Sequence, residues 1–284
     1  MIGPQLSPNR SADSRVSDAY LDLLTDTLLG LNWDDGTRPV APGTIRNPLK
    51  RWATSMISRR LARYGISLSH RHRDWEKERE SGRDWPDRAC TMIGKKRLDH
   101  LRHAALTVIE EEIPGDFLET GVWRGGACIL LRGVLRAVRD ENRTVWCADS
   151  FCGLPRPTED ADDGDEHWTK DELAVDLDSV KDNFRRFDLL DDRVQFLPGW
   201  FHETLPKAPI EQLAILRLDG DMYSSTMDAL RATYSKVSPG GFVIVDDYGH
   251  PPAQQACQEY LSSIGQAPTI EMIDHIGAYW RTPH

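Results

Sequence analysis

Several features that would place this 284-residue chain in a particular class of protein are absent from it. Its five cysteines include no Cys-x-x-Cys pair, which argues against both a disulfide framework and a zinc knuckle. None of its apolar runs approaches the roughly 18 residues of a membrane-spanning helix, and its polar first residues lack the apolar stretch of a secretory signal. We therefore expect a cytoplasmic protein with reduced cysteines and no membrane partner.

Positive charge is also scarce. The chain has 35 Lys and Arg residues against 45 Asp and Glu residues, so its formal net charge is −10. Phosphate backbones are bound by basic surfaces, and this balance argues against nucleic acid as the main partner. With 39% hydrophobic residues and a mean hydropathy of −0.51, the composition is that of a globular protein with one main core.

Residues 1–89 are expected to form a helical, partly disordered extension. Residues 20–33 have helical apolar spacing. A second helical stretch, residues 48–65, mixes apolar residues with four arginines: Arg51, Arg59, Arg60 and Arg63. Such a basic face suits an acidic surface or membrane headgroups, but it is more often a solvated face packed on its own domain or on a dimer partner. We expect a homo-oligomer, a dimer or higher.

From residue 90 to residue 284, apolar strands alternate with helices. The predicted strands are residues 116–120, 144–150, 193–200, 213–221 and 241–249. This alternation predicts an α/β fold with a doubly wound, mostly parallel sheet and right-handed crossovers. The closing residues 268–284 predict one or two further strands, which often run antiparallel at the edge of such a sheet.

The turn after the first of these strands, "ETGVWRGG", indicates the kind of ligand. Gly121, Gly125 and Gly126 allow the backbone to approach a ligand closely, and Glu119 ends the strand as an acceptor. A dinucleotide site would show Gly-x-Gly-x-x-Gly and place pyrophosphate on the helix N-terminus. Because the carboxylate of Glu119 would repel pyrophosphate but suits a cationic ligand, the turn favours S-adenosylmethionine over NAD. A purely structural glycine turn remains an alternative.

The ends of the next two strands support a nucleoside ligand. Asp149 follows the glycine turn by about 30 residues, where a carboxylate can accept hydrogen bonds from a ribose diol. Its alternative role is to cap the next helix, in which case Ser150 would have no role in ligand binding. Trp200 and Phe201, after the third strand, have the shape to flank an adenine; the alternative is that one of the two only closes the core.

Three carboxylates follow the last two parallel strands. Asp219 comes after "ILRL", and Asp246 and Asp247 come after "FVIV". If these strands are neighbours, the three groups would repel one another unless a cation neutralised them. Mg²⁺ takes oxygen ligands and leaves positions for substrate hydroxyls, so we expect a magnesium site. The alternative is that Asp247 caps the following helix and Asp219 is merely polar.

Between the second and third strands lies the acidic loop, residues 156–172, with six acids between Glu159 and Glu166. We expect it to be a mobile lid over an acceptor site, with His167 and Trp168 as acceptor contacts. The commoner meaning of such a charge run is a solvated loop.

Taken together, these motifs resemble one family. The segments "TMIGKKRLDHL", "DFLETGVWRGGACILLRGVL", "WCADSFCGLPRP", "LRLDGDMYSSTMDAL" and "KVSPGGFVIVDDYGH" are similar to the macrocin O-methyltransferase family of antibiotic-sugar methyltransferases. The resemblance, over residues 90–280, implies a Rossmann-like class I methyltransferase that uses S-adenosylmethionine and Mg²⁺ to methylate a deoxysugar hydroxyl of a small-molecule glycoside. It implies Asp219, Asp246 and Asp247 as metal ligands. The residues it places around the cofactor are Thr91, Met92, Glu119, Thr120, Gly121, Gly125, Asp149, Ser150, Ser179, Gly199, Trp200 and Asp219.

The general base is less constrained by these motifs. Catechol methyltransferases, whose metal arrangement is similar, have a lysine shortly after the first metal-binding aspartate, whereas this chain has "DGDMYSS". We expect Asp221 to be the base, with His250 and Asp219 as competing candidates. Three other functions stay open: a catechol-type methyltransferase of a phenolic metabolite, a catalytically silent scaffold that binds S-adenosylmethionine, and, more distantly, a nicotinamide oxidoreductase.

Overall fold

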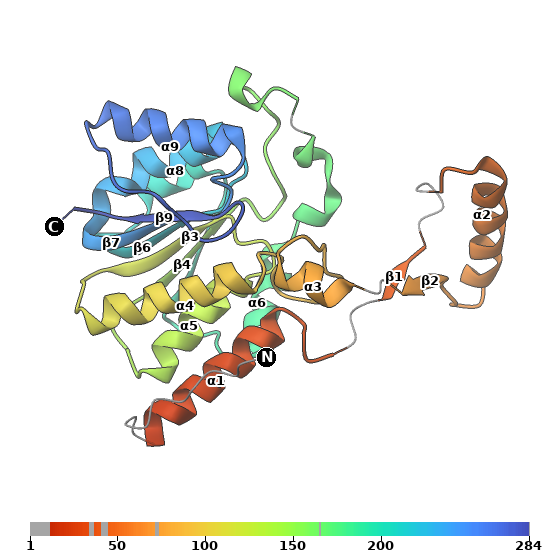
Figure 1. Cartoon of the computed structure of the whole chain (residues 1–284), viewed down its shortest axis with the longest axis horizontal. Coiled ribbons are helices and arrows are strands. Elements are labelled where there is room, and N and C mark those ends of the chain that lie inside the picture. Colours follow the sequence, from red (N-terminus) through yellow and green to blue (C-terminus); the bar gives the residue numbers. More distant parts are fainter. Residues whose placement is uncertain (1–11, 34–36, 41–44, 72–73, 165, 284) are drawn as a thin grey trace.

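A seven-stranded sheet forms the centre of the computed structural model, which describes residues 12–33, 37–40, 45–71, 74–164 and 166–283 (Figure 1). The strand order across the sheet is β5-β4-β3-β6-β7-β9-β8. The strands are β3 (Asp116–Thr120), β4 (Val145–Asp149), β5 (Val194–Pro198), β6 (Leu213–Leu218), β7 (Val237–Val245), β8 (Glu271–Met272) and β9 (Ala278–Arg281).

The first five of these strands run parallel, and the last two do not. β9 pairs antiparallel with β7, and β8 pairs antiparallel with β9. The prediction of a doubly wound, mostly parallel sheet with an antiparallel edge is therefore confirmed. The strand order reverses between β3 and β6, and in open α/β sheets ligands bind at such a reversal, beyond the carboxyl ends of the strands.

Helices cover both faces of the sheet. Helices α1 (Ala12–Leu28), α4 (Lys95–Glu110), α5 (Gly126–Ala137) and α6 (Leu177–Arg186) share one hydrophobic core, and α8 (Tyr223–Thr233) and α9 (Pro251–Ser263) share a second core on the opposite face (Figure 1). Consecutive strand residues alternate between them: Phe117 belongs to the first core and Leu118 to the second. This alternation follows from the two-residue period of side chains along a strand.

The first helix is part of the main core although it precedes the expected boundary near residue 90. Leu21, Leu24 and Leu28 of α1 are all buried, and α1 packs against α4 and α5. The expected extension of residues 1–89 thus contains a helix that belongs to the hydrophobic core of the sheet.

Residues 37–40 and 45–71 belong to an arm that lies apart from the sheet (Figure 1). Within it, β1 (Thr37–Pro39) and β2 (Ser69–Arg71) pair antiparallel at the base of α2 (Pro48–Ala62). No residue of α2 is buried, and four of its large apolar side chains are exposed: Leu49, Trp52, Met56 and Ile57. Within the residues that the structure describes, no helix combines the length and apolarity that crossing a bilayer requires.

Candidate functional site

A cavity of about 450 Å³ opens at the carboxyl ends of the parallel strands. Its walls come from the segment before α4, the glycine turn after β3, the ends of β4 and β5, and the loops after β6 and β7. Sixteen of the residues that we predicted from the sequence line it: Thr91, Met92, Glu119, Gly121, Gly126, Asp149, Ser150, His167, Gly199, Trp200, Phe201, Asp219, Asp221, Asp246, Asp247 and His250.

Backbone hydrogen bonds continue past the strand ends and hold this rim of the sheet together. In each case, a residue just beyond one strand donates its N–H to a carbonyl at the end of the neighbouring strand. The four bonds are Gly199 to Asp149 (2.9 Å), Gly121 to Ala148 (2.9 Å), Asp219 to Thr120 (2.8 Å) and Asp246 to Leu218 (2.8 Å). The backbone that carries the candidate site residues is therefore an extension of the sheet rather than a set of free loops.

Three predicted cofactor residues do not line the cavity. Thr120 is buried, and its hydroxyl lies 3.4 Å from the carbonyl oxygen of Arg217. Gly125 precedes α5 with φ of +90°, a conformation that favours glycine. Ser179 lies at the exposed start of α6, where its hydroxyl donates to Asp176 at 2.7 Å. For these three residues the structure shows a local structural role outside the wall of the cavity.

The glycines of the turn that line the cavity also approach other parts of the protein closely. A Cβ atom on Gly121 would lie 1.6 Å from the carbonyl oxygen of Asp219, and one on Gly126 would lie 2.6 Å from that of Cys90. Both separations are far inside van der Waals contact. Glycine is therefore required at both positions for this turn to pack against the loop after β6 and the segment before α4.

Asp149 both faces the cavity and fastens the glycine turn. Its Oδ2 atom accepts hydrogen bonds from the N–H groups of Val122 (2.6 Å) and Trp123 (3.2 Å), and its Oδ1 atom accepts one from Phe151 (2.7 Å). Burial raises the pKa of Asp149, and these hydrogen bonds oppose that rise because they favour the ionised carboxylate. Since each carboxylate oxygen has two lone pairs, the side chain retains acceptor capacity toward a ligand.

Glu119 has a partner that the sequence analysis missed. It lies opposite Arg217 in the register of β3 and β6, and the guanidinium of Arg217 pairs with its carboxylate. Both side chains are about 98% buried or more. Burial raises the pKa of Glu119, and the charge of Arg217 opposes that rise. A signal was present in the sequence, because Arg217 is a lone charge inside the apolar run "LAILRL", and a buried arginine needs carboxylate partners.

Arg217 also contacts two of the predicted metal ligands. Its Nη1 atom lies 2.8 Å from Oδ2 of Asp219, and its Nη2 atom pairs with Oδ1 of Asp246. The other oxygen of Asp246 pairs with Arg97 of α4, which in turn lies 3.1 Å from Asp274. Neither arginine was among the residues predicted from the sequence. Together they pair with both carboxylate oxygens of Asp246.

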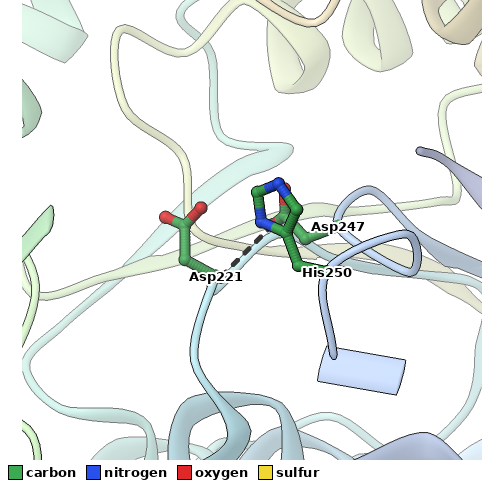
Figure 2. Close-up of side chains that lie close together, drawn as sticks. All are labelled: Asp221, Asp247 and His250. Carbon is green, nitrogen blue, oxygen red and sulfur yellow. Dashed lines mark hydrogen bonds between the residues drawn. The ribbon is translucent and has the colours of Figure 1, made fainter. Parts of the chain in front are cut away.

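Two overlapping groups of side chains have the composition and spacing of a metal site. Ligand atoms of Asp219, Asp246 and Asp247 lie within 4.8 Å of one another, and so do those of Asp221, Asp247 and His250. Asp221 comes from the loop after β6, whereas Asp247 and His250 come from the segment between β7 and α9 (Figure 2). The backbone N–H of Asp221 lies 3.3 Å from Oδ2 of Asp247, which ties the two loops together.

The electrostatics of this cluster fit a divalent cation. Burial raises the pKa of Asp219 well above its usual range, and the neighbouring Asp246 adds to the rise. Burial, followed by the charge of Asp221, does the same to Asp247. The cluster joins six carboxyl groups to two guanidiniums, namely Glu119, Asp219, Asp221, Asp246, Asp247 and Asp274 with Arg97 and Arg217. Because carboxyl groups outnumber guanidinium groups here, the cluster suits a hard cation such as Mg²⁺, which prefers oxygen ligands.

The acidic loop runs along the cavity, but none of its described acids lines it. Among its described residues, those at the cavity wall are Arg156, Thr158 and His167, while Trp168 stacks against Arg156 with 5.5 Å between the guanidinium carbon and the ring centroid. The predicted contact of His167 with an acceptor thus has a place in the structure, whereas Trp168 lies outside the cavity wall.

The family, the relatives and the solved structure that this chain matches are all O-methyltransferases. Residues 17–282 match the family described as macrocin-O-methyltransferase (TylF). A demethyldecarbamoylnovobiocin O-methyltransferase of Streptomyces niveus is 52% identical over 271 residues, which cover 93% of this chain and 94% of the relative. An 8-demethyl-8-(2,3-dimethoxy-alpha-L-rhamnosyl)-tetracenomycin-C 4'-O-methyltransferase of Streptomyces olivaceus is 50% identical over 204 residues, or 70% of this chain and 78% of the relative. The solved structure of the O-methyltransferase NovP matches with a TM-score of 0.79 and 44% identity, covering 94% of this chain and 100% of that structure.

Proposed function

The chain belongs to the macrocin-O-methyltransferase family, and from this premise we propose that it methylates a hydroxyl group of a deoxysugar in a glycosylated natural product. The family makes the chain an O-methyltransferase that uses S-adenosylmethionine. The names of the relatives support an antibiotic glycoside as the acceptor. One relative is named for methylating demethyldecarbamoylnovobiocin, and another for methylating a tetracenomycin that carries a rhamnosyl group.

The observation that carries this proposal is the position of the carboxylate cluster beside the predicted cofactor residues in one cavity. We assign Asp149, with Thr91, Met92 and Trp200, to the cofactor side of the cavity. When bound there, S-adenosylmethionine supplies an electrophilic methyl group. Methyl transfer is an in-line displacement, so the walls of the cavity have to hold the acceptor oxygen opposite the sulfonium and exclude water.

We propose that Asp219, Asp246 and Asp247 hold a divalent cation on the other side of the cavity. A cation at that point lowers the pKa of a sugar hydroxyl, which is otherwise a poor acid. Asp246 enters such a site already oriented by Arg97 and Arg217, because both of its oxygens are paired. The arginines would fix the direction of this carboxylate before any metal binds.

Proton removal falls to a side chain next to this cluster. We propose Asp221 as the general base, with His250 and Asp219 as the competing candidates. Asp221 has a left-handed backbone conformation, with φ of +58°, which is uncommon for a residue other than glycine. Strained conformations of this kind concentrate at functional sites. Its position in the wall of the cavity, beside Asp247, is where the acceptor hydroxyl would lie.

The arm suggests how the enzyme assembles. Residues 45–64 contain six Lys and Arg residues and no acids, so with −10 for the whole chain the remaining residues carry −16. The exposed apolar face of α2 lies among these positive charges, and Trp52 is 62% exposed. An isolated apolar face of this kind marks an interaction surface. We propose that it packs against the acidic body of a second copy of this chain in a homo-oligomer, and that the protein is cytoplasmic.

The function is tested with the purified enzyme, S-adenosylmethionine and matched pairs of glycosides and aglycones. The expected result is the gain of one methyl group on the glycoside, detected by mass spectrometry, in the presence of Mg²⁺ and not after chelation. Methylation of the aglycone at the same rate would point to a phenolic acceptor instead. Absence of turnover on every glycoside, with cofactor binding intact, would favour a catalytically silent scaffold.

A further inference from the structure

Asp162 differs from the other acids of the acidic loop because it is buried. Its side chain is only 1% exposed, whereas its neighbours Asp160 and Asp163 are exposed. Buried carboxylates are rare unless they are paired or hydrogen-bonded. A run of acids that the sequence presents as a solvated surface therefore contains one member with a separate role.

The partners of Asp162 are the first N–H groups of α8. Its Oδ1 atom accepts a hydrogen bond from the N–H of Tyr223 at 2.6 Å, and its Oδ2 atom accepts one from Ser224 at 3.1 Å. The first N–H groups of a helix have no hydrogen-bond partner within the helix. Met222, the residue directly before α8, supplies no side-chain cap. Asp162 therefore caps α8 from 61 positions away, and its charge also suits the positive end of the helix.

The capped helix begins directly after the loop that carries Asp219 and Asp221. That loop is tight, since the N–H of Met222 lies 2.6 Å from the carbonyl oxygen of Gly220 and Asp221 has the left-handed conformation described above. Holding the N–H groups of residues 223 and 224 consequently holds the backbone one peptide beyond Asp221.

The far end of the acidic loop is fastened to the opposite wall of the cavity. The indole N–H of Trp123, in the glycine turn, donates to the carbonyl oxygen of Glu172 at 2.8 Å, and the ammonium of Lys170 lies 4.7 Å from the ring centroid of Trp85. Between the two attachments, Arg156, Thr158 and His167 line the cavity. The loop thus connects the cofactor side of the site to the start of α8.

We propose that Asp162 is a positioning residue that couples closure of the acidic loop to the placement of Asp221. When the loop lies over the cavity, Asp162 completes the cap of α8 and fixes the backbone beside the base. When the loop leaves, those N–H groups lose their acceptor and the loop of residues 219–222 gains freedom. The catalytic consequence rests on the proposed role of Asp221, whereas the coupling between the loop and α8 does not.

The test compares Asp162→Ala, Asp162→Asn and the control Asp163→Ala in the full-length enzyme saturated with S-adenosylmethionine. Trypsin cleaves after Lys170 but not after Arg156, which precedes Pro157, so the cleavage rate at Lys170 reports release of the loop. We expect Asp162→Ala to speed cleavage at Lys170 and to lower kcat, each by roughly tenfold, the scale of losing one helix cap. Asp162→Asn keeps an acceptor oxygen and should recover much of both, and Asp163→Ala should match the wild type.

Two outcomes would overturn the proposal. One is an Asp162→Ala enzyme whose loop is cleaved at the wild-type rate, whatever its activity. The other is faster cleavage with unchanged kcat and KM, which would leave Asp162 as a cap with no effect on the site. Because cleavage is measured without an acceptor, a failure of the proposed sugar methylation would leave this first readout intact. If Asp162→Ala does not fold, Asp162→Asn is compared with Asp163→Asn, and the same two changes are expected at smaller size because the amide keeps only one of the two acceptor oxygens.

Discussion

The Nη1 atom of Arg217 lies 2.8 Å from Oδ2 of Asp219, two residues further along the chain. Side chains two residues apart on a strand point to the same face, so the arginine accompanies the aspartate to the edge of the sheet. The same guanidinium reaches Glu119 on β3 and Asp246 after β7. One buried cation therefore joins three adjacent strands just beneath the proposed metal site.

This relationship predicts a large cost for removing the arginine. Arg217→Met leaves buried carboxylates without their partner, and breaking a buried pair in this way destabilises a protein by roughly 3–5 kcal/mol. Denaturant unfolding of the metal-free enzyme measures the change in the free energy of unfolding. The matched control is Arg231→Met, since Arg231 is exposed on α8. A loss no greater than that of the control would show that Arg217 does not organise the cluster.

Replacing the proposed base should separate chemistry from binding. We expect Asp221→Asn to lower kcat by about 10²- to 10⁴-fold, the usual contribution of a positioned base, with little change in cofactor affinity. Steady-state kinetics and calorimetric titration with S-adenosylhomocysteine provide the measurements. His250→Gln is the comparison, because a small loss of kcat in Asp221→Asn with a large loss in His250→Gln would transfer the role to His250.

His100 predicts how stability depends on pH away from the site. Burial lowers its pKa from 6.5 to about 4, and both of its ring nitrogens are buried without a hydrogen-bond partner among the described residues. Its ring centroid lies 4.2 Å from that of Tyr279. Between these two pKa values the unfolded chain binds a proton that the folded protein does not, so the contribution of His100 to stability is lost as pH falls through this window.

The size of that loss is roughly 3 kcal/mol between about pH 7 and about pH 4. In His100→Phe, which keeps a ring against Tyr279 but cannot titrate, the fall in stability over this range should be smaller by that amount. The control His103→Gln, on the exposed side of the same helix, should keep most of the wild-type slope. Parallel curves for the wild type and His100→Phe would exclude the effect.

The arm predicts a change of assembly. Trp52→Glu combined with Met56→Glu places two negative charges on the exposed apolar face of α2, and these should repel an acidic partner copy. Light scattering after gel filtration is expected to show a smaller species than the wild type, with methyl transfer measured alongside. Ile264→Glu changes an exposed apolar residue at the end of α9 and should not affect assembly. An unchanged mass for the double variant would place the interface elsewhere.

Much of this architecture could be predicted from local patterns in the sequence. The alternation of apolar strands and helices predicted the parallel sheet. Because Asp149, Asp219 and Asp246 lie at strand ends or directly after them, the sequence also predicted that these residues meet at one edge of the sheet. Such patterns depend on neighbours in the chain. The pairs made by Arg217 with Glu119 and by Arg97 with Asp246 span 98 and 149 residues, and no local pattern identifies such partners. The role of Asp162 could not be predicted for the same reason, because two strands and two α-helices separate it from its partners in the sequence.

The chain of hydrogen bonds along the strand ends, from Gly199 across to Asp246, has a practical consequence for redesign. The parts that we assign to methyl donor and metal lie on one continuous backbone framework, while the acidic loop, which we expect to cover the acceptor, is a separate segment whose attachments include Asp162 and Glu172. Acceptor preference should therefore be transferable between relatives by grafting this segment with its two attachments, without rebuilding the catalytic edge. Chimeras cut at residues 155 and 173 would be the natural first library.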